Sequence, residues 1–407
     1  MSVKTPQLLD LPVMSQAELD DICRKNERFN SGRTSGLRAN LAWRNLAGLT
    51  LSLHDLSGAD LTGANLEGAA LLGAKLDNAN LFGANLENAD LRKASLRRAN
   101  LKAVCLRNAD LSEADLYEAD LCEGSIAVGD RKLGYRLIGK SGPGKVGASA
   151  EATSGSGPVK ADLTGAVMRK TRLSRANMKL CVLAFADLTG ADLTQAKMRG
   201  ADLTKAVLLD ARTQYADTVD AILEGALLKP PADGNDDEPS LADQVLDHVL
   251  WSETSGRSGQ AGVFDAADLR GLKTLKGKVL TALSARGAIF YGLNLEGAQL
   301  QGARLEGADL RTCNLRGADL RGARLTGALL TGADLQGANL GPLELGGGRR
   351  LPKDLASADL RRANLTGACL QGAMLDGADV RRADFSGAEL LGASLAFGET
   401  FGRKGAA

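Results

Sequence analysis

Apolar positions recur at every fifth residue through most of the chain. From Leu41 to Ile126 each fifth residue is apolar, with seventeen leucines and one isoleucine, and we call this residue the centre of its quintet. Alanine usually lies two residues before the centre and Asp or Asn directly before it, as in Ala59-Asp60-Leu61. Gly, Ser, Thr or charged residues follow the centre. A repeat this short and regular indicates a solenoid.

A five-residue period fits neither an α-helix nor a flat strand. On a helix with about 3.6 residues per turn the centres would drift around the axis, and on a strand they would alternate between faces. A chain that turns a corner every five residues keeps all centres and alanines inside. Four such sides close a square coil, and stacked coils pair their backbones about 4.8 Å apart.

The Ala-(Asp/Asn)-Leu-x-x quintets resemble those of the pentapeptide repeat proteins, and the resemblance covers well over half of the chain. It implies an all-β fold, the right-handed quadrilateral β-helix. Asp and Asn suit the place before the centre because their side chains hydrogen-bond to nearby backbone and stabilise turns. Gly after the centre relieves turn strain.

Two segments outside the quintets have the pattern of short amphipathic helices. Each begins with Ser and has an acidic residue three places later, Ser15 with Glu18 and Ser240 with Asp243, as in a capping box. Each then runs through Ser-Gly-Arg into irregular quintets. An open first coil would expose apolar surface and unpaired backbone, so we expect both helices to cover one.

The chain is therefore interpreted as two tandem solenoids, each preceded by a short capping α-helix. The predicted segments are an N-terminal segment with a capping helix (1–37), repeat block one (38–126), a flexible basic Gly/Ser-rich loop (127–160), repeat block two (161–228), a linker with the second capping helix (229–262), repeat block three (263–340), a loop (341–357), repeat block four (358–397) and a C-terminal tail (398–407). The centres stay in frame across the loop at 341–357, which predicts a bulge from one solenoid.

Composition agrees with a Leu/Ala-filled solenoid, since 44% of residues are hydrophobic and 3% are aromatic. The net charge of +1 does not favour direct binding of nucleic acid or of an anionic membrane. No run of eighteen apolar residues occurs and the N-terminus has no apolar core, so we expect neither membrane spanning nor export. Six scattered cysteines without a Cys-x-x-Cys pair favour a reduced, cytoplasmic protein.

The predicted loop contains a formal P-loop match at residues 134–141 and a formal Gly-x-Gly-x-x-Gly at residues 142–147. Phosphate binding by either motif needs a preceding apolar strand and a following helix. Gly, Ser and Pro follow here, and chance matches are expected among forty-nine glycines. A flexible basic loop is therefore favoured, with a nucleotide-binding enzyme as a minor alternative.

Candidate catalytic groups are scarce. The chain has two histidines. His54 lies at an inward position of the irregular first coil and is expected to pack or to form a hydrogen bond. His248 lies on the second predicted helix near Trp251, where both are expected to pack or to lie at the edge of the cap. Acidic pairs follow from the repeat alone, and a filled coil offers no cleft to shift their pKa. We expect no enzyme activity, no cofactor and no metal site.

Charge is distributed in bands. Residues 55–123 contain twelve acids and seven bases (net −5), and residues 160–212 contain ten bases and five acids (net +5). A basic girdle on four sides of one coil lies within the acidic band: Arg92, Lys93, Arg97, Arg98, Lys102 and Arg107. Together with four residues of the basic loop it forms the candidate partner-binding surface; these are Arg131, Lys132, Arg136 and Lys140. A mixed solvated surface is the simpler interpretation, and a banded surface that selects a partner is the alternative.

The leading hypothesis is a non-catalytic scaffold that presents rigid faces and loops to a protein partner of unknown identity. The resemblance adds an alternative, a DNA-mimicking binder or modulator of a type II topoisomerase, although such proteins are strongly acidic and this chain is not. The chain ends after Leu395 without a second helix, so a homodimer through the uncapped C-terminal coil is also expected.

Overall fold

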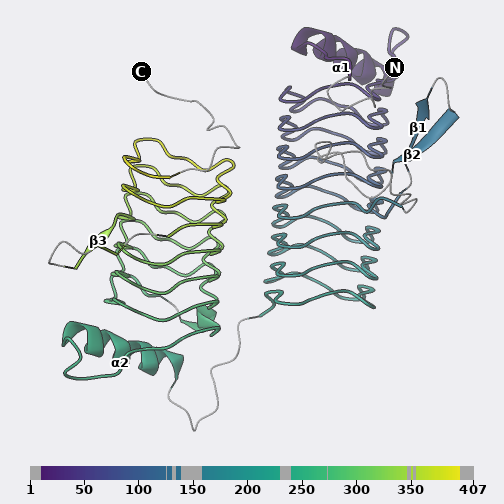
Figure 1. The fold of residues 1–407 in the computed structure, drawn as a ribbon. Coiled ribbons are helices and arrows are strands. Elements are labelled where there is room, and N and C mark those ends of the chain that lie inside the picture. Colours follow the sequence, from purple (N-terminus) through teal and green to yellow (C-terminus); the bar gives the residue numbers. More distant parts are fainter. Residues whose placement is uncertain are drawn as a thin grey trace. The chain divides into compact units, whose positions relative to one another are not determined.

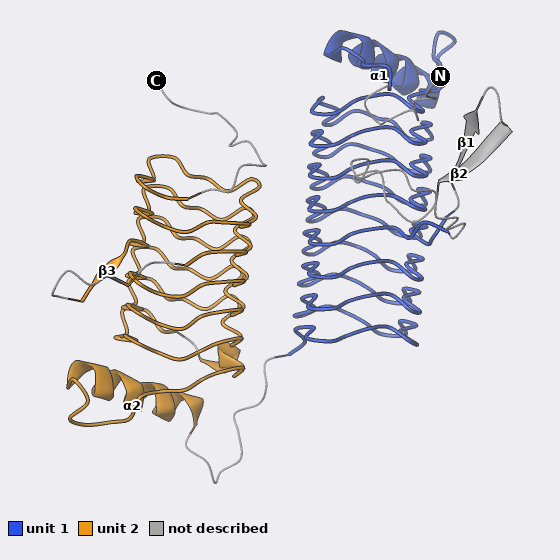
Figure 2. Ribbon diagram, in the orientation of Figure 1, with its two compact units in different colours: residues 1–229 blue, residues 230–407 orange. Residues whose placement is uncertain are grey.

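The computed structural model divides the chain into two compact units, Met1–Lys229 and Pro230–Ala407 (Figure 2). It describes residues 11–124, 126–130, 134–138, 158–229, 240–272, 274–345, 350–351 and 354–394. Each unit is a stack of coils with one helix at its beginning, α1 (Gln16–Asn30) and α2 (Leu241–Glu253) (Figure 1).

Successive coils are joined by single parallel β-bridges between residues twenty positions apart, such as Asp60 with Asn80 and Asn80 with Asn100. The bridging residue is the one before the centre. The backbone N–H of the centre donates to the carbonyl of the bridging residue in the next coil, as from Leu61 to Asn80 at 2.7 Å. This spacing agrees with the four-sided coil expected from the quintets. One bridge per side leaves no long strand in the described coils.

The interior of each stack is filled by its own side chains. The centres and alanines of the inner coils are almost fully buried, and they form one continuous core from Leu19 to Leu208 and a second from Val245 to Leu375. The second residue after most centres turns the corner with a positive φ, as at Gly63 (61°). Glycine adopts this conformation without strain, which explains its frequency at this place.

The first interruption leaves the stack as a hairpin of β1 (Ile126–Asp130) and β2 (Gly134–Ile138), which pair antiparallel. Gly124 pairs with Val159 at its base. Cys105 then pairs with Asp162, so the coils continue on the far side of the insertion. The prediction that Ile126 is a centre of the coil was wrong. Ile126 lies opposite Ile138 in the hairpin, because the chain has already left the coil.

The second interruption also leaves one stack intact. Strands β3 (Leu343–Glu344) and β4 (Arg350–Leu351) pair antiparallel. Arg324 on one side of the loop bridges to Asp354 on the other, and the centres on both sides belong to one core. This agrees with the bulging loop expected from the frame of the centres.

Both helices begin directly after the predicted serine. The Ser15 side chain accepts the N–H of Glu18, and the Glu18 side chain accepts the N–H of Ser15, which completes the capping box of α1. Helix α1 adds Leu19 and Cys23 to the first core. Helix α2 adds Val245 to the second core. A short 3-10 helix in the first coil of this unit, η2 (Leu269–Gly271), adds Leu269 to the same core.

Candidate functional site

The acidic residue before each centre mainly holds the turn of its own quintet. Asp60 Oδ1 accepts the backbone N–H of Thr62 at 3.1 Å and its hydroxyl at 2.6 Å. The same pair of bonds recurs where Asp162, Asp187 and Asp202 precede threonine by two residues. These carboxylates accept hydrogen bonds within the backbone turns. The number of acidic residues in the sequence therefore overstates the number of carboxylates that a partner could contact.

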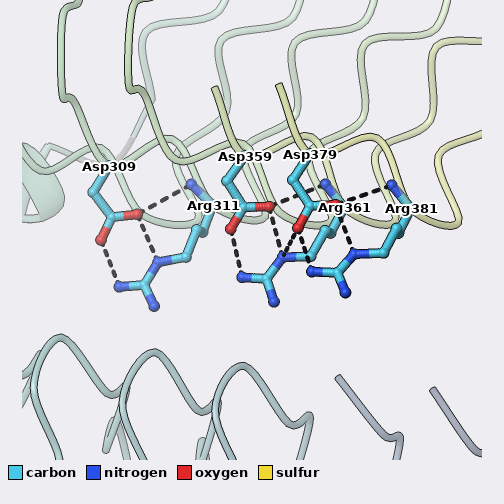
Figure 3. A network of polar contacts seen from close by, with 6 residues as sticks. All are labelled: Asp309, Arg311, Asp359, Arg361, Asp379 and Arg381. Atoms are coloured by element: carbon cyan, nitrogen blue, oxygen red, sulfur yellow. Dashed lines mark hydrogen bonds and ion pairs between the residues drawn. The ribbon is translucent and has the colours of Figure 1, made fainter. Parts of the chain in front are cut away.

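Arginine two residues after such an acid closes the carboxylate in a fork. Arg311 donates from Nε at 2.8 Å and from Nη2 at 2.6 Å to the two oxygens of Asp309, and its backbone N–H donates as well (Figure 3). The pairs of Asp359 with Arg361 and Asp379 with Arg381 repeat this arrangement two and three coils further along the same column of bridging residues (Figure 3). Bidentate pairs of this kind hold the guanidinium and the carboxylate in a fixed geometry on the surface of the coil.

The predicted basic girdle is paired with carboxylates on its own and neighbouring coils. The ion pairs, at 2.7–3.9 Å, join Arg92 with Asp90, Lys93 with Glu113, Arg97 with Asp115, Arg98 with Glu118, Lys102 with Asp120, and Arg107 with Glu87 and Asp162. The girdle therefore spans four sides without forming one patch. Arg131, Lys132 and Lys140 lie outside the described residues, and Arg136 lies in β2, which is described by its backbone alone.

One side of the first stack gathers arginines around a tyrosine. Tyr117 has three guanidinium groups near its ring, with the carbon of Arg172 at 4.7 Å from the ring centre, that of Arg97 at 5.4 Å and that of Arg175 at 5.9 Å. Arg175 also donates from Nη1 to the Tyr117 hydroxyl at 3.1 Å. With their acidic partners these residues form what we call the Tyr117 cluster: Arg97, Arg98, Asp115, Tyr117, Glu118, Arg172 and Arg175.

Two carboxylates serve four arginines in the Tyr117 cluster. Asp115 Oδ2 lies 3.9 Å from Arg97 and 3.3 Å from Arg172. Glu118 lies 2.9 Å from Arg98 and 3.5 Å from Arg175. The hydrogen bond from Arg98 is the largest cause that holds the pKa of Glu118 below its ordinary value. By formal charge the cluster keeps an excess of two positive charges.

Arg97 and Arg98 were predicted from the sequence as part of a binding surface, whereas the other members of this cluster were not. Asp115 bridges to Arg172, fifty-seven residues away, because the insertion lengthens the usual offset of twenty. The quintets of Asp115-Leu116-Tyr117-Glu118 and Arg172-Leu173-Ser174-Arg175 share one register. Alignment of the coils across the insertion is the signal that could have found the cluster.

The formal P-loop motif does not have the expected surroundings. Gly134–Ile138 forms β2 of an antiparallel hairpin, whereas a P-loop would start as a turn between a strand and a helix. Gly139, Lys140 and Ser141 lie outside the described residues, as does the Gly-x-Gly-x-x-Gly match at 142–147.

Most cysteine and histidine side chains in the described part of the chain are buried or contact neighbouring side chains, as expected for structural residues. Burial raises the pKa of Cys23 to about 12 and that of Cys122 to about 11, and it raises the pKa of Cys181 and Cys313 further. His54 Nδ1 lies 2.9 Å from a Glu27 carboxylate oxygen of α1.

The described part of the chain contains no cluster of three potential metal ligands, and none of its helices is long and apolar enough to cross a membrane.

His248 packs as predicted, fully buried and stacked on Trp251 with ring centres 5.6 Å apart. Its Nδ1 accepts the N–H of Gly262 at 2.8 Å, and burial lowers its pKa below the ordinary 6.5. At a pH between the pKa of His248 in the folded protein and its pKa in the unfolded chain, the unfolded chain binds more protons at this residue. The free energy of unfolding therefore falls as the pH drops below about 6.5. We expect the second unit to unfold at lower urea at pH 5.5 than at pH 7.5, monitored by Trp fluorescence.

His248→Asn can place its amide oxygen where Nδ1 accepts the N–H of Gly262, and it removes the titrating ring. This variant should lose the part of the pH dependence that the wild type shows between about pH 6.5 and the folded pKa. An equal pH dependence in both proteins would contradict the assignment to His248.

Comparison with known proteins identifies the repeats. The family model described as pentapeptide repeats matches residues 38–121, 186–229, 280–341 and 354–396, which is more than half of the chain. Among solved structures, a pentapeptide repeat protein from the Arabidopsis thaliana thylakoid lumen is 35% identical over 21% of this chain and 67% of its own, with a TM-score of 0.20.

Two further solved structures match over more of the chain. HetL, a pentapeptide repeat protein involved in heterocyst differentiation regulation from Nostoc sp. strain PCC 7120, is 25% identical over 93% of this chain and 96% of its own, with a TM-score of 0.15. QnrB1, a plasmid-mediated fluoroquinolone resistance protein, is 14% identical over 79% of this chain and 90% of its own, with a TM-score of 0.14. No curated protein matches this chain. The family match and the quintet-based coils together show that the chain belongs to the pentapeptide repeat proteins, whose fold is a right-handed β-helix.

Proposed function

We propose that this protein is a non-catalytic scaffold that binds a protein partner on the outer sides of its β-helix. Leu and Ala fill the interior of the coils, which leaves the outer sides and the loops for recognition. The observation that carries the proposal is the Tyr117 cluster, in which two segments fifty-seven residues apart build one charged, partly exposed surface. Rigid solenoid surfaces of this kind suit protein recognition.

The scaffold is further proposed to be a tandem of two solenoids, each covered at its first coil by a helix. Three side chains of α1 support this role in the first unit. Gln16 exchanges two hydrogen bonds with the backbone of Thr50, and Asn26 and Asn30 donate to backbone oxygens of the first coil. In the second unit the buried His248 of α2 accepts the N–H of Gly262. Such contacts shield apolar surface and backbone at the open end of a stack.

The candidate partner-binding surface is proposed to centre on the Tyr117 cluster, which includes Arg97 and Arg98 of the girdle. The remaining girdle and loop residues stay predicted contacts. A homodimer through the last coil also stays a prediction, which the partial exposure of its centres Val380, Phe385 and Leu390 favours. A cytoplasmic location is proposed on the scattered cysteines alone.

Binding to a type II topoisomerase by mimicry of DNA is the second candidate, and it rests on the family resemblance. Mimicry of DNA requires carboxylates that face solvent as an array. Asp60, Asp77 and Asp90 in block one instead accept hydrogen bonds from nearby turns or arginines. This favours the more general scaffold.

Affinity capture from native lysate tests the scaffold. The bait is the full chain, and the matched control replaces residues 126–157 with a short Gly-Ser linker that keeps the bridge between Gly124 and Val159. We expect both to retain a specific protein partner, because the Tyr117 cluster is intact in each. Loss of the partner with the linker variant would move recognition to the loop. Recovery of the bait alone from both would contradict a partner-binding role.

A further inference from the structure

We propose that the Tyr117 cluster binds an extended acidic segment of a protein, with carboxylates of the segment between the arginines. The inference rests on the proposed scaffold function and specifies the chemistry of its partner. It concerns the side of the first stack whose centres are Leu96, Leu116 and Leu173, where one bridging column joins Ser95, Asp115 and Arg172.

The charge of the cluster is the first argument. Four guanidinium groups share two carboxylates, and each carboxylate serves arginines from different coils. The arginine side chains are 45–65% exposed, so their heads reach solvent. A ligand with two negative charges would neutralise the excess, and guanidinium groups pair with carboxylates in a planar, bidentate way.

Preorganisation is the second argument. The Tyr117 ring lies beside three of the guanidinium groups, and Gln195 Oε1 accepts a hydrogen bond from Arg175 at 2.9 Å. Contacts with an aromatic ring hold arginine side chains in place. A ligand therefore meets arginines that are already ordered, which lowers the entropic cost of binding.

The spacing favours an extended peptide. Arg97 and Arg172 lie two coils apart in the stack, which is about 10 Å at the spacing of paired strands. In an extended chain, residues two or three positions apart are separated by about 7–10 Å. Two acidic side chains at such positions can contact the arginines of both coils.

The arrangement is less suitable for nucleic acid. Asp115 and Glu118 lie among the arginines, and Asp77 and Asp192 lie on the same side of the stack in the coils beyond them. A continuous line of phosphates would lie against these acids as well as the arginines, whereas separate carboxylates can avoid them. The net charge of +1 also gives no long-range attraction for nucleic acid.

The test measures binding of fluorescein-labelled octaglutamate to the full-length protein at low salt by fluorescence anisotropy. Octaglutamine and an eight-nucleotide single-stranded DNA serve as comparison probes. We expect octaglutamate to bind and the other two probes to bind more weakly. Arg172→Gln with Arg175→Gln should weaken octaglutamate binding about tenfold.

Two variants provide controls. Arg316→Gln with Arg324→Gln removes two arginines of similar exposure (48% and 62%) from the second unit, each also near one acid, and should leave binding within about twofold. Asp115→Asn should strengthen binding, because it adds one positive charge to the excess. The repeat accepts Asn at this place, as at Asn100, so the change preserves the fold. Circular dichroism checks folding of all variants.

Equal octaglutamate binding by the wild type and the Arg172/Arg175 variant, or no binding by the wild type, would overturn the inference. Tighter binding of the DNA probe than of octaglutamate would overturn it in favour of nucleic acid. The scaffold function has a separate readout in affinity capture. A partner that both the wild type and the Arg172/Arg175 variant retain equally would refute the inference and leave the scaffold standing, whereas no partner at all would refute the scaffold.

Discussion

Replacement of Leu111 by Ala is expected to destabilise the first unit by about 2–5 kcal/mol. Leu111 is a fully buried centre in the coil before the insertion, and its N–H donates to Val167 on the far side. The filled coil can collapse little around a missing side chain, so both the transfer energy and a cavity contribute to the loss. Calorimetry should show the transition of the first unit moved to lower temperature.

The second unit should keep its transition, because its buried side chains form a separate core. Leu330→Ala, at a fully buried centre of the second unit, should shift the other transition instead. Leu53→Ala removes a side chain that is 78% exposed and should change neither transition appreciably. If Leu111→Ala and Leu330→Ala move the same transition, the two cores are not independent.

Asn26→Ala is expected to release α1 from the first coil at a cost of about 2–4 kcal/mol. Asn26 is fully buried, donates from Nδ2 to the Asp55 carbonyl at 2.9 Å and accepts the Ala39 N–H at 2.7 Å. Alanine would leave that carbonyl and that N–H without these partners in a buried place, which is more costly than the loss of an exposed hydrogen bond. Urea unfolding measured by circular dichroism checks the change.

The exposed Asn30 supplies the matched control. Its Nδ2 donates to Asp55 Oδ1 at 3.0 Å, so Asn30→Ala removes a contact between the same helix and coil without burying an unpaired group. We expect a loss below about 1 kcal/mol for this variant. Asn26→Ala should also promote self-association in light scattering, because the first coil loses its cover. Equal stability of the two variants would show that α1 does not protect the coil through Asn26.

The coil itself was predictable because one rule acts at every quintet. A corner every five residues fixes the bridge of Asp60 with Asn80, and the same rule gives the bridges of the second unit. The helix starts were also predictable, since Ser15 and Ser240 hydrogen-bond within three residues. Interactions this local depend on the sequence nearby and on little else.

Ile126 and the Tyr117 cluster were not predictable in the same way. Ile126 continues the five-residue period, but the hairpin with Ile138 competes with the coil for it. Arg172 meets Asp115 because the insertion sets an offset of fifty-seven residues. Such an offset depends on where the chain leaves and rejoins the stack, which the period does not specify.

Charge counts along the sequence were also an incomplete guide to the surface. The acidic and basic bands suggested separate regions, whereas pairing occurs between adjacent coils, as for Arg98 with Glu118, or within one quintet, as for Asp309 with Arg311. The excess charge of the Tyr117 cluster depends on how carboxylates are shared across coils. Composition does not contain that information.

Arginine-specific labelling with phenylglyoxal, read by mass spectrometry, tests most directly whether the outer side of the first stack is the recognition surface. The full-length protein is labelled alone and in complex with its captured partner. We expect four arginines to become protected together in the complex: Arg97, Arg98, Arg172 and Arg175. Arg316 and Arg324 should be labelled equally in both states. Equal labelling of the first four arginines in the free protein and the complex would contradict this expectation.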